Sequence, residues 1–141
     1  MTGAGGARRG ASPGTFVYRE AVRFRDLDGM GHVNNAVFLT YMESARSAFL
    51  LEHGLIASLA DLRVILARVE IDFRSQLEFG ETVDVEVRPA KLGTKSFELE
   101  YELRAGDRVV ANATSVQVGF DYETGETIAI PERWRKLLTP E

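Results

Sequence analysis

The sequence predicts an α+β protein in which an antiparallel sheet covers a single long helix. Two observations predict this class. Apolar residues recur at three- and four-residue steps after residue 34, which is typical of a helix. Apolar and polar residues alternate in one segment before that helix and in four segments after it, which is typical of half-buried strands. The chain has 141 residues, which fits one domain, and five strands can bury one helix against one face of their sheet.

The composition excludes several classes of protein. With 17 basic and 21 acidic residues the net charge is −4, which argues against nucleic acid as the main partner. The chain has no cysteine, and this excludes disulfides, thiolate metal sites and a cysteine nucleophile. No apolar run approaches the ~18 residues of a membrane span. We therefore expect a cytoplasmic protein without a membrane span.

Residues 1–14 are mostly Gly, Ala, Ser and Arg, and they predict a flexible tail before a domain that spans residues 15–141. The letters GASPG at residues 10–14 match the G-x-S-x-G motif of serine hydrolases. That motif requires a strand before it and a helix after it. Because the sequence predicts neither there, we interpret the match as chance.

The first strand is predicted over residues 15–25, where apolar side chains alternate with charged ones. Asn34 or Asn35 is a suitable N-cap for the helix, which is predicted to run to about Leu51 and to end at His53-Gly54. The apolar face of this helix is broad, so we expect the helix to be buried on most sides. It is formed by Val37, Phe38, Tyr41, Met42, Ala45, Ala48 and Phe49.

The rest of the chain predicts one or two helical turns over residues 56–62 and then four strands. These strands cover residues 63–75, 83–88, 97–104 and 109–120, with a link at 89–95 and turns at 105–107 and 121–125. The last three strands form an antiparallel meander with one solvent-exposed face and one buried face. One face of the last strand carries Val110, Asn112, Thr114, Val116, Val118 and Phe120. A short helix is predicted over 131–138. Open sheet edges of this kind are commonly covered by dimerisation.

Residues 25–35 (RDLDGMGHVNN) combine two carboxylates, two glycines, a histidine and two asparagines where the strand pattern gives way to the helix. One interpretation is a turn with an N-cap. The other is a chemical site, in which the Asp28 carboxylate acts as a nucleophile or a base beside free N–H groups near Asn34 and Asn35. That arrangement suits acyl transfer or hydrolysis, and also proton abstraction beside a carbonyl group.

A metal or phosphate site is not predicted from the same residues. A calcium loop that starts at Asp26 would need oxygen ligands where the chain has Met30 and Val37. His32 and His53 lack the spacing of a zinc site. The glycines have neither the third glycine of a dinucleotide loop nor the Lys-Ser/Thr of a P-loop. We therefore predict no metal ligands.

The combined pattern D-x-D-x-x-G-H-V-N-N at residues 26–35 and Y-x-E-x-x-R at residues 41–46 resembles the signature of a known family. This is the 4-hydroxybenzoyl-CoA thioesterase-like family of hotdog-fold acyl-CoA thioesterases. The resemblance covers about residues 16–120 and implies a five-stranded antiparallel sheet wrapped around one long central helix. It also implies a homodimer or homotetramer with active sites between subunits, and no cofactor beyond the coenzyme A that forms part of the substrate.

The resemblance assigns roles by position. Asp28 corresponds to the catalytic aspartate, which either attacks directly or activates water, and the backbone N–H at Asn35 polarises the thioester carbonyl. His32 and Asn34 shape the loop or contact substrate, and a purely structural histidine is an equal alternative for His32. Glu43 faces the acyl pocket. The alternative for Glu43 is an i,i+3 ion pair with the arginine that ends the motif.

Thr94, Lys95 and Ser96 resemble the segment that contacts the nucleotide end of coenzyme A, and a lysine with hydroxyls suits phosphate. A solvated turn is the alternative. Some relatives carry more arginines here, so an acyl-carrier-protein thioester stays open as the substrate beside an acyl-CoA. We predict a thioesterase that releases a free acid and a thiol. The alternatives are a hydratase or dehydratase of acyl thioesters and a non-catalytic domain that binds acyl-CoA.

Overall fold

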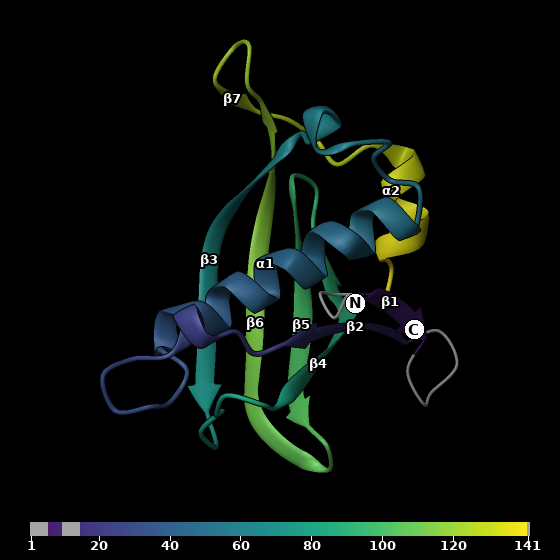
Figure 1. Ribbon diagram of the computed structural model, residues 1–141. Helices are drawn as coiled ribbons and strands as arrows, with labels where there is room; N and C mark the ends of the chain where they lie inside the picture. The colour runs from purple at the N-terminus through teal and green to yellow at the C-terminus, as the bar shows by residue number, and fades with distance from the viewer. Residues whose placement is uncertain (1–5, 10–14, 141) are drawn as a thin grey trace.

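The computed structural model describes residues 6–9 and 15–140 and confirms the predicted α+β class. One long helix, α1 (Asn35–Glu52), lies across one face of a curled antiparallel sheet, and a short helix, α2 (Glu132–Leu138), lies near its C-terminal end (Figure 1). The strands are β1 (Gly6–Arg9), β2 (Phe16–Ala21), β3 (Val64–Phe73), β4 (Thr82–Leu92), β5 (Ser96–Ala105), β6 (Arg108–Asp121) and β7 (Glu126–Thr127). Two 3-10 turns, η1 (Phe24–Asp26) and η2 (Leu59–Asp61), flank α1 in the sequence.

The strands of the sheet follow the order β1-β2-β4-β5-β6-β3, and β7 pairs with the end of β6. All pairs are antiparallel, as predicted. Among the described residues β3 forms one edge of the sheet, because β6 is its only neighbour. Neither helix in the described part of the chain has the length and apolar character that a membrane crossing requires.

The helix begins and ends as the sequence predicts. Asn34 is the N-cap, its side-chain oxygen accepts a hydrogen bond from the Ala36 N–H at 2.9 Å, and His53 follows the last turn. Gly54 then adopts a positive φ of 70°, which a glycine reaches without strain. These two caps fix the position of α1 along the sheet.

The apolar face of α1 packs on the sheet as predicted, but the helix is not buried on most sides. Its buried residues are Phe38, Tyr41, Met42, Ala45, Phe49 and Leu50. They meet the inner side chains of β4 and β5, such as Val85 and Leu99. Leu39 and Glu43 point away from this core and are exposed, so one side of the helix is open in a single chain.

The first predicted strand ends four residues earlier than expected. The chain leaves β2 at Ala21 and turns at η1, because the Asp26 carboxylate accepts a hydrogen bond of 2.9 Å from the Arg23 N–H. Phe24, which continued the alternating pattern, is 76% exposed. The pattern at residues 22–25 therefore reflects a surface turn and not a strand.

Two further strand boundaries differ from the sequence prediction. Residues 89–92 belong to β4 and not to a link, because a register shift between Pro89 and Lys91 accommodates the proline. Gly6–Arg9 pairs with β2 as β1, where only a flexible tail was predicted. The rest of that tail, including the GASPG letters at residues 10–14, lies outside the described residues.

From Ala111 on, the inner face of β6 is small and partly polar, whereas Thr114, Val116 and Val118 lie on the half-buried outer face. Val110 was predicted to share the face of Asn112, but it is buried in the core. Ala111, Ala113, Ser115 and Gln117 point under α1. The predicted grouping of Asn112, Thr114, Val116 and Val118 on one face is right, and that face is the outer one. This polar inner strip reappears in the candidate site.

Candidate active site

The Asp28 loop, residues 27–33, connects η1 to α1 and is closed on itself. Leu27 and Val33 form an isolated bridge, and the Asp28 N–H donates a hydrogen bond of 2.7 Å to the His32 carbonyl. Val33 also donates to the Leu77 carbonyl at 2.8 Å, which fixes the loop to the connection between β3 and β4. Gly31 has a φ of 85°, so the closed shape depends on a residue without a Cβ.

The Asp28 side chain is exposed on this loop. Its Oδ1 atom accepts hydrogen bonds from the N–H groups of Met30 at 2.8 Å and His32 at 3.3 Å. Among the described residues Oδ2 has no hydrogen-bond partner. The loop therefore holds one carboxylate oxygen and leaves the other without a partner in the described part of the chain.

The start of α1 supplies the backbone groups that face solvent beside this loop. Asn34 is joined to the preceding turn, because its N–H donates to the Asp26 carbonyl at 2.9 Å. Asn35 is the first helical residue and is exposed, and no described residue accepts a hydrogen bond from its N–H. The N–H groups in the first turn of a helix lack intrahelical partners, so this one can bind a carbonyl oxygen.

His32 is half-buried, and its Nε2 atom lies 3.8 Å from Oε2 of Glu78. The two residues also form an isolated backbone bridge. These contacts anchor the loop to the β3–β4 connection. They are what a structural histidine requires, and they leave both interpretations of His32 in place.

Glu43 does not form the i,i+3 ion pair that was the alternative to its role in a pocket. No ion pair joins Glu43 to Arg46 in the described part of the chain, and the Arg46 guanidinium instead donates to the Tyr101 hydroxyl at 3.1 Å. Both side chains line two adjoining cavities of about 600 and 150 Å³ between α1 and β3. Glu43 thus lies at a cavity, and its role in an acyl pocket stays a prediction.

A chain of buried polar groups continues from Arg46 across the sheet. The Tyr101 hydroxyl lies 2.5 Å from Oγ of Ser115, and Ser115 also bonds to the Gln117 side chain. Gln117 donates in turn to the Phe97 carbonyl at 3.2 Å and lines the larger cavity. Sequence reasoning missed these residues. The available signal was the alternation along β6, in which Ser115 and Gln117 occupy the inward positions and Val116 and Val118 the outward ones.

Asp26, behind the loop, is the second group that sequence reasoning missed. It is 3% exposed and accepts hydrogen bonds from the Arg23 N–H at 2.9 Å and the Tyr41 hydroxyl at 2.8 Å. Burial alone would raise its pKa, but these hydrogen bonds and the Arg23 guanidinium hold the pKa below the ordinary value. Burial and the bond to Asp26 raise the pKa of Tyr41. Asp26 is therefore a charged support for the loop, and its burial separates it from substrate.

Glu20 on β2 completes this buried acidic group. One of its carboxylate oxygens has no hydrogen-bond partner in the described part of the chain. Burial is the main cause that raises the pKa of Glu20, and the nearby Asp26 charge adds to it while Arg23 opposes it. Two carboxylates thus share the space beneath the N-terminal half of α1.

Thr94 and Lys95 lie in the turn between β4 and β5, and Ser96 is the first residue of β5. Within a single chain these three residues lie far from Asp28. The Lys95 carbonyl accepts a hydrogen bond from Gly119 near the end of β6, whereas the Asp28 loop is fixed to residues 77–78 near the start of β6. β6 has 14 residues, so these places are separated by roughly 40 Å of strand. Figure 1 shows the loop and the β4–β5 turn at opposite ends of the sheet.

The described residues contain no group of three or more His, Asp or Glu side chains that could hold a metal ion. His32 faces a single carboxylate. His53 packs on the Phe49 ring, and its Nδ1 atom lies 2.9 Å from the Phe49 carbonyl oxygen.

The curled sheet around one helix, with an open carboxylate at the helix start, defines the hotdog-fold class of thioesterases. A family model described as the thioesterase-like superfamily matches residues 22–138. The chain belongs to this superfamily, which confirms the predicted family and the predicted class of enzyme, a thioester hydrolase.

Solved structures and curated relatives agree with this membership. A thioesterase from Thermus thermophilus, complexed with coenzyme A and Zn, is 36% identical, with a TM-score of 0.79 over 86% of this chain and 90% of that one. A predicted thioesterase from Bacillus stearothermophilus is 25% identical, with a TM-score of 0.80 over 90% and 98%. A 1,4-dihydroxy-2-naphthoyl-CoA hydrolase of Nostoc punctiforme is 27% identical over 127 residues, 84% of this chain and 82% of that protein.

Proposed function

We propose that the protein hydrolyses an acyl-CoA thioester to a free acid and coenzyme A, with Asp28 as the catalytic residue. The observation that carries the proposal is the open Oδ2 atom of Asp28 beside a helix start whose Asn35 N–H has no partner in the described chain. The names of the relatives support an acyl-CoA substrate, because one is a CoA hydrolase and another was solved with coenzyme A.

In this proposal the thioester carbonyl oxygen accepts a hydrogen bond from the Asn35 N–H, which stabilises the negative charge of the tetrahedral intermediate. Asp28 takes a proton from a water molecule that attacks the carbonyl carbon, or it attacks that carbon itself. The C–S bond then breaks, and the thiolate leaves and is protonated. Attack by water gives the free acid directly, whereas attack by Asp28 gives a mixed anhydride that water then hydrolyses to the free acid and the regenerated Asp28 carboxylate.

After a single turnover in ¹⁸O-water, label in the Asp28 carboxylate would identify direct attack followed by water attack at the Asp28 carbonyl of the anhydride. Label in the free acid alone fits both routes, and trapping of the anhydride with hydroxylamine then separates direct attack from base catalysis.

The active site is completed by a second copy of the chain. Two features support this part of the proposal: the roughly 40 Å of strand between Asp28 and Lys95 in one chain, and the cavities beside the edge strand β3. Asp28 of one copy would act with the Lys95 segment of the other, in a homodimer or homotetramer.

Mixed oligomers test this arrangement. Asp28→Asn and Thr94→Ala/Lys95→Ala proteins should each be impaired, whereas a co-expressed mixture should regain activity, since one of its two sites carries neither change. Failure of the mixture to exceed both parents would refute a shared site. Light scattering on the wild type separates a dimer from a tetramer.

Hydrolysis would need no metal or redox cofactor, because Asp28 and a backbone N–H supply the chemistry, and we expect the enzyme to work in the cytoplasm. Dialysis against a chelator should leave turnover unchanged. A loss of turnover that added zinc reverses would contradict the proposal that hydrolysis needs no metal.

Thiol release from short, long and aromatic acyl-CoAs and from acyl-carrier-protein thioesters tests the function itself. Turnover of an acyl-CoA with formation of the free acid is the expected result. Three other results would replace the proposal with one of its alternatives. Thiol release from carrier-protein thioesters alone would indicate a carrier-protein thioesterase, and addition or loss of water across the acyl chain would indicate a hydratase or dehydratase. Binding without turnover would indicate a non-catalytic domain.

A further inference from the structure

Asp28 is the only aspartate or asparagine in the sequence that a glycine follows. The backbone nitrogen after an aspartate can attack the side-chain carboxyl group, because the two groups are held together by the chain and close a small ring. A glycine favours this reaction, since no Cβ hinders the approach of its nitrogen. The residue that the proposed function makes catalytic is therefore also the position in the chain that is most prone to ring closure.

The loop leaves the nitrogen of Gly29 free to react. No described residue accepts a hydrogen bond from the Gly29 N–H. Asp28 and Gly29 are both exposed, and a Cβ on Gly29 would meet no atom within 4 Å. A ring between these two residues therefore has space in the folded protein, and water can reach it.

The hydrogen bonds of the Asp28 carboxyl group assist attack at its carbon atom. Oδ1 accepts the N–H groups of Met30 at 2.8 Å and His32 at 3.3 Å. When a nitrogen adds to Cγ, negative charge develops on a carboxyl oxygen, and N–H groups that already point at that oxygen stabilise the charge. Oδ2 has no partner in the described part of the chain, so it is the oxygen that can leave.

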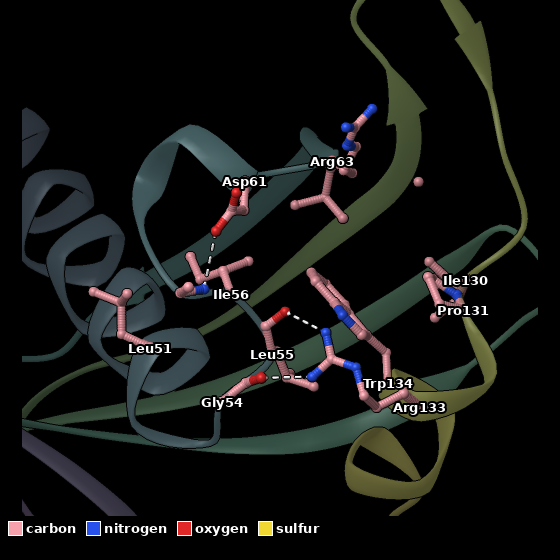
Figure 2. A pocket seen from close by; sticks show the side chains of 13 residues that line it. Leu51, Gly54, Leu55, Ile56, Asp61, Arg63, Ile130, Pro131, Arg133 and Trp134 are labelled. Carbon is pink, nitrogen blue, oxygen red and sulfur yellow. Dashed lines mark hydrogen bonds between the residues drawn. The ribbon is translucent and has the colours of Figure 1, made fainter.

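Asp61, in the η2 turn beyond the C-terminal end of α1, is a natural comparison (Figure 2). It is exposed, and its Oδ2 atom also accepts two backbone N–H groups, both at 3.1 Å. However, the next residue is Leu62, whose N–H donates to the Leu59 carbonyl at 3.2 Å. Asp61 thus combines a similar carboxylate with a nitrogen that is neither free nor followed by a bare Cα.

We propose that Asp28 and Gly29 form a modification site, at which Asp28 converts to isoaspartate through a succinimide. The Gly29 nitrogen bonds to Cγ of Asp28, and the bond from Cγ to Oδ2 breaks. Oδ2 leaves as water with the proton of the N–H group and one proton from solvent. Water then opens the ring and returns a proton to solvent. Attack at Cγ restores aspartate, whereas attack at the main-chain carbonyl carbon gives isoaspartate, in which the chain continues through Cγ.

Isoaspartate at residue 28 abolishes the arrangement of the candidate site, and this consequence rests on the proposed function. The Asp28 carbonyl oxygen, which accepts the Gly31 N–H at 3.1 Å, becomes part of the free carboxylate. That carboxylate is bonded directly to Cα, and the main chain of the loop gains one CH₂ group. The loop, which the bridge between Leu27 and Val33 closes, then no longer places a carboxylate oxygen beside the Asn35 N–H. Turnover is lost as the modification accumulates.

The test follows the wild type and Gly29→Ala during storage at neutral pH and physiological temperature. Gly29 has no positive φ, so alanine fits its backbone as well as its surroundings. Peptide mapping with electron-transfer fragmentation distinguishes isoaspartate from aspartate at residues 28 and 61 of each sample. A synthetic peptide of residues 25–35 gives the rate without the folded loop. Turnover of an acyl-CoA is measured on the same samples, relative to the starting value of each protein.

Isoaspartate should accumulate at residue 28 of the wild type, but not at residue 61 and not in Gly29→Ala. The fraction of turnover that the wild type loses should equal its fraction of isoaspartate. Aspartate that stays intact in the folded wild type after the peptide has converted would overturn the inference. Isoaspartate without a loss of turnover, or a wild type that never hydrolyses a thioester, would instead overturn the proposed function, so the two failures are distinct.

Asp28→Asn gives a second readout of the opposite sign. Its side-chain amide closes the same ring with loss of ammonia, and hydrolysis of the ring then forms aspartate in part of the molecules. Freshly prepared Asp28→Asn should have low turnover and should gain turnover on storage in proportion to the aspartate formed. The double variant Asp28→Asn/Gly29→Ala should gain none. An Asp28→Asn protein that keeps its amide while the matching peptide loses it would refute the modification site.

Discussion

The Tyr41 hydroxyl donates a hydrogen bond of 2.8 Å to Oδ2 of Asp26, and both side chains are buried, at 0% and 3% exposure. This bond joins the middle of α1 to the turn before the Asp28 loop. The Asp26 carbonyl also accepts the N–H of Asn34, the helix cap. Asp26 therefore contacts both α1 and its cap, through its carboxylate and its backbone carbonyl respectively.

Tyr41→Phe should destabilise the protein by about 1.5–3 kcal/mol, because it removes a hydrogen bond to a buried charge. Denaturant unfolding measures the loss. Tyr122→Phe is the matched control, since the Tyr122 hydroxyl donates at 2.8 Å to the neutral Val64 carbonyl, and it should cost about 1 kcal/mol or less. Equal losses in the two variants would contradict a charged Asp26 in the native state.

The acid stability of the protein should depend on Asp26. Its pKa is lowered in the folded state, so its contribution is complete above the ordinary carboxyl pKa of about 3.9 and is lost as the pH falls through the folded value. The free energy of unfolding, measured from pH 5 down to pH 2.5, should fall less steeply for Asp26→Asn than for the wild type. Parallel curves would show that Asp26 does not carry this dependence.

Glu20 should change the pH dependence of stability in the direction opposite to Asp26. Its pKa is raised in the folded state, so folding favours its protonated form, and the resulting stability is lost as the pH rises through the folded pKa. Glu20→Gln should therefore unfold at a higher temperature than the wild type at pH 7, with the difference shrinking at pH 4. A variant that is less stable than the wild type at pH 7 would disprove an uncompensated buried charge.

Gly119 on β6 permits the close approach of the segment that contains Ile128. A Cβ at this position would lie 2.4 Å from the Ile128 carbonyl oxygen, so Gly119→Ala must displace that segment and should cost about 1–3 kcal/mol. Gly29→Ala, whose Cβ would meet no atom within 4 Å, is the control in the same unfolding experiment. Similar stabilities for the two variants would mean that the segment moves freely.

The sequence predicted the helix, its caps and five strands because local rules determine them. The Asn34 cap, the turn at Gly54 and the alternation in β5 each depend on neighbours in the chain. The end of β2 at Ala21 could not be predicted, because it depends on the Asp26 carboxylate that turns the chain. The register shift near Pro89, which extends β4, depends on its pairing with β5.

The candidate site shows the same division. A motif of neighbouring residues identified Asp28 and the helix start, since both lie in one short stretch. In the polar chain from Arg46 to Gln117, the bonds from Arg46 to Tyr101 and from Tyr101 to Ser115 join residues 55 and 14 positions apart, and no spacing rule connects these pairs. The distance between Lys95 and Asp28 depends on how the strands are arranged in the sheet, and the pattern of neighbouring residues in the sequence does not determine that arrangement.

The central claim is that Asp28 performs the chemistry, and the turnover number of Asp28→Asn on an acyl-CoA tests it most directly. The substitution keeps the side-chain oxygen that accepts the loop hydrogen bonds, so the variant should fold with wild-type thermal stability. Its turnover should fall at least about 100-fold, as expected when a catalytic base or nucleophile is lost. Asp107→Asn, in the exposed β5–β6 turn, should retain full turnover. An Asp28→Asn protein that releases thiol as fast as this control would contradict the account.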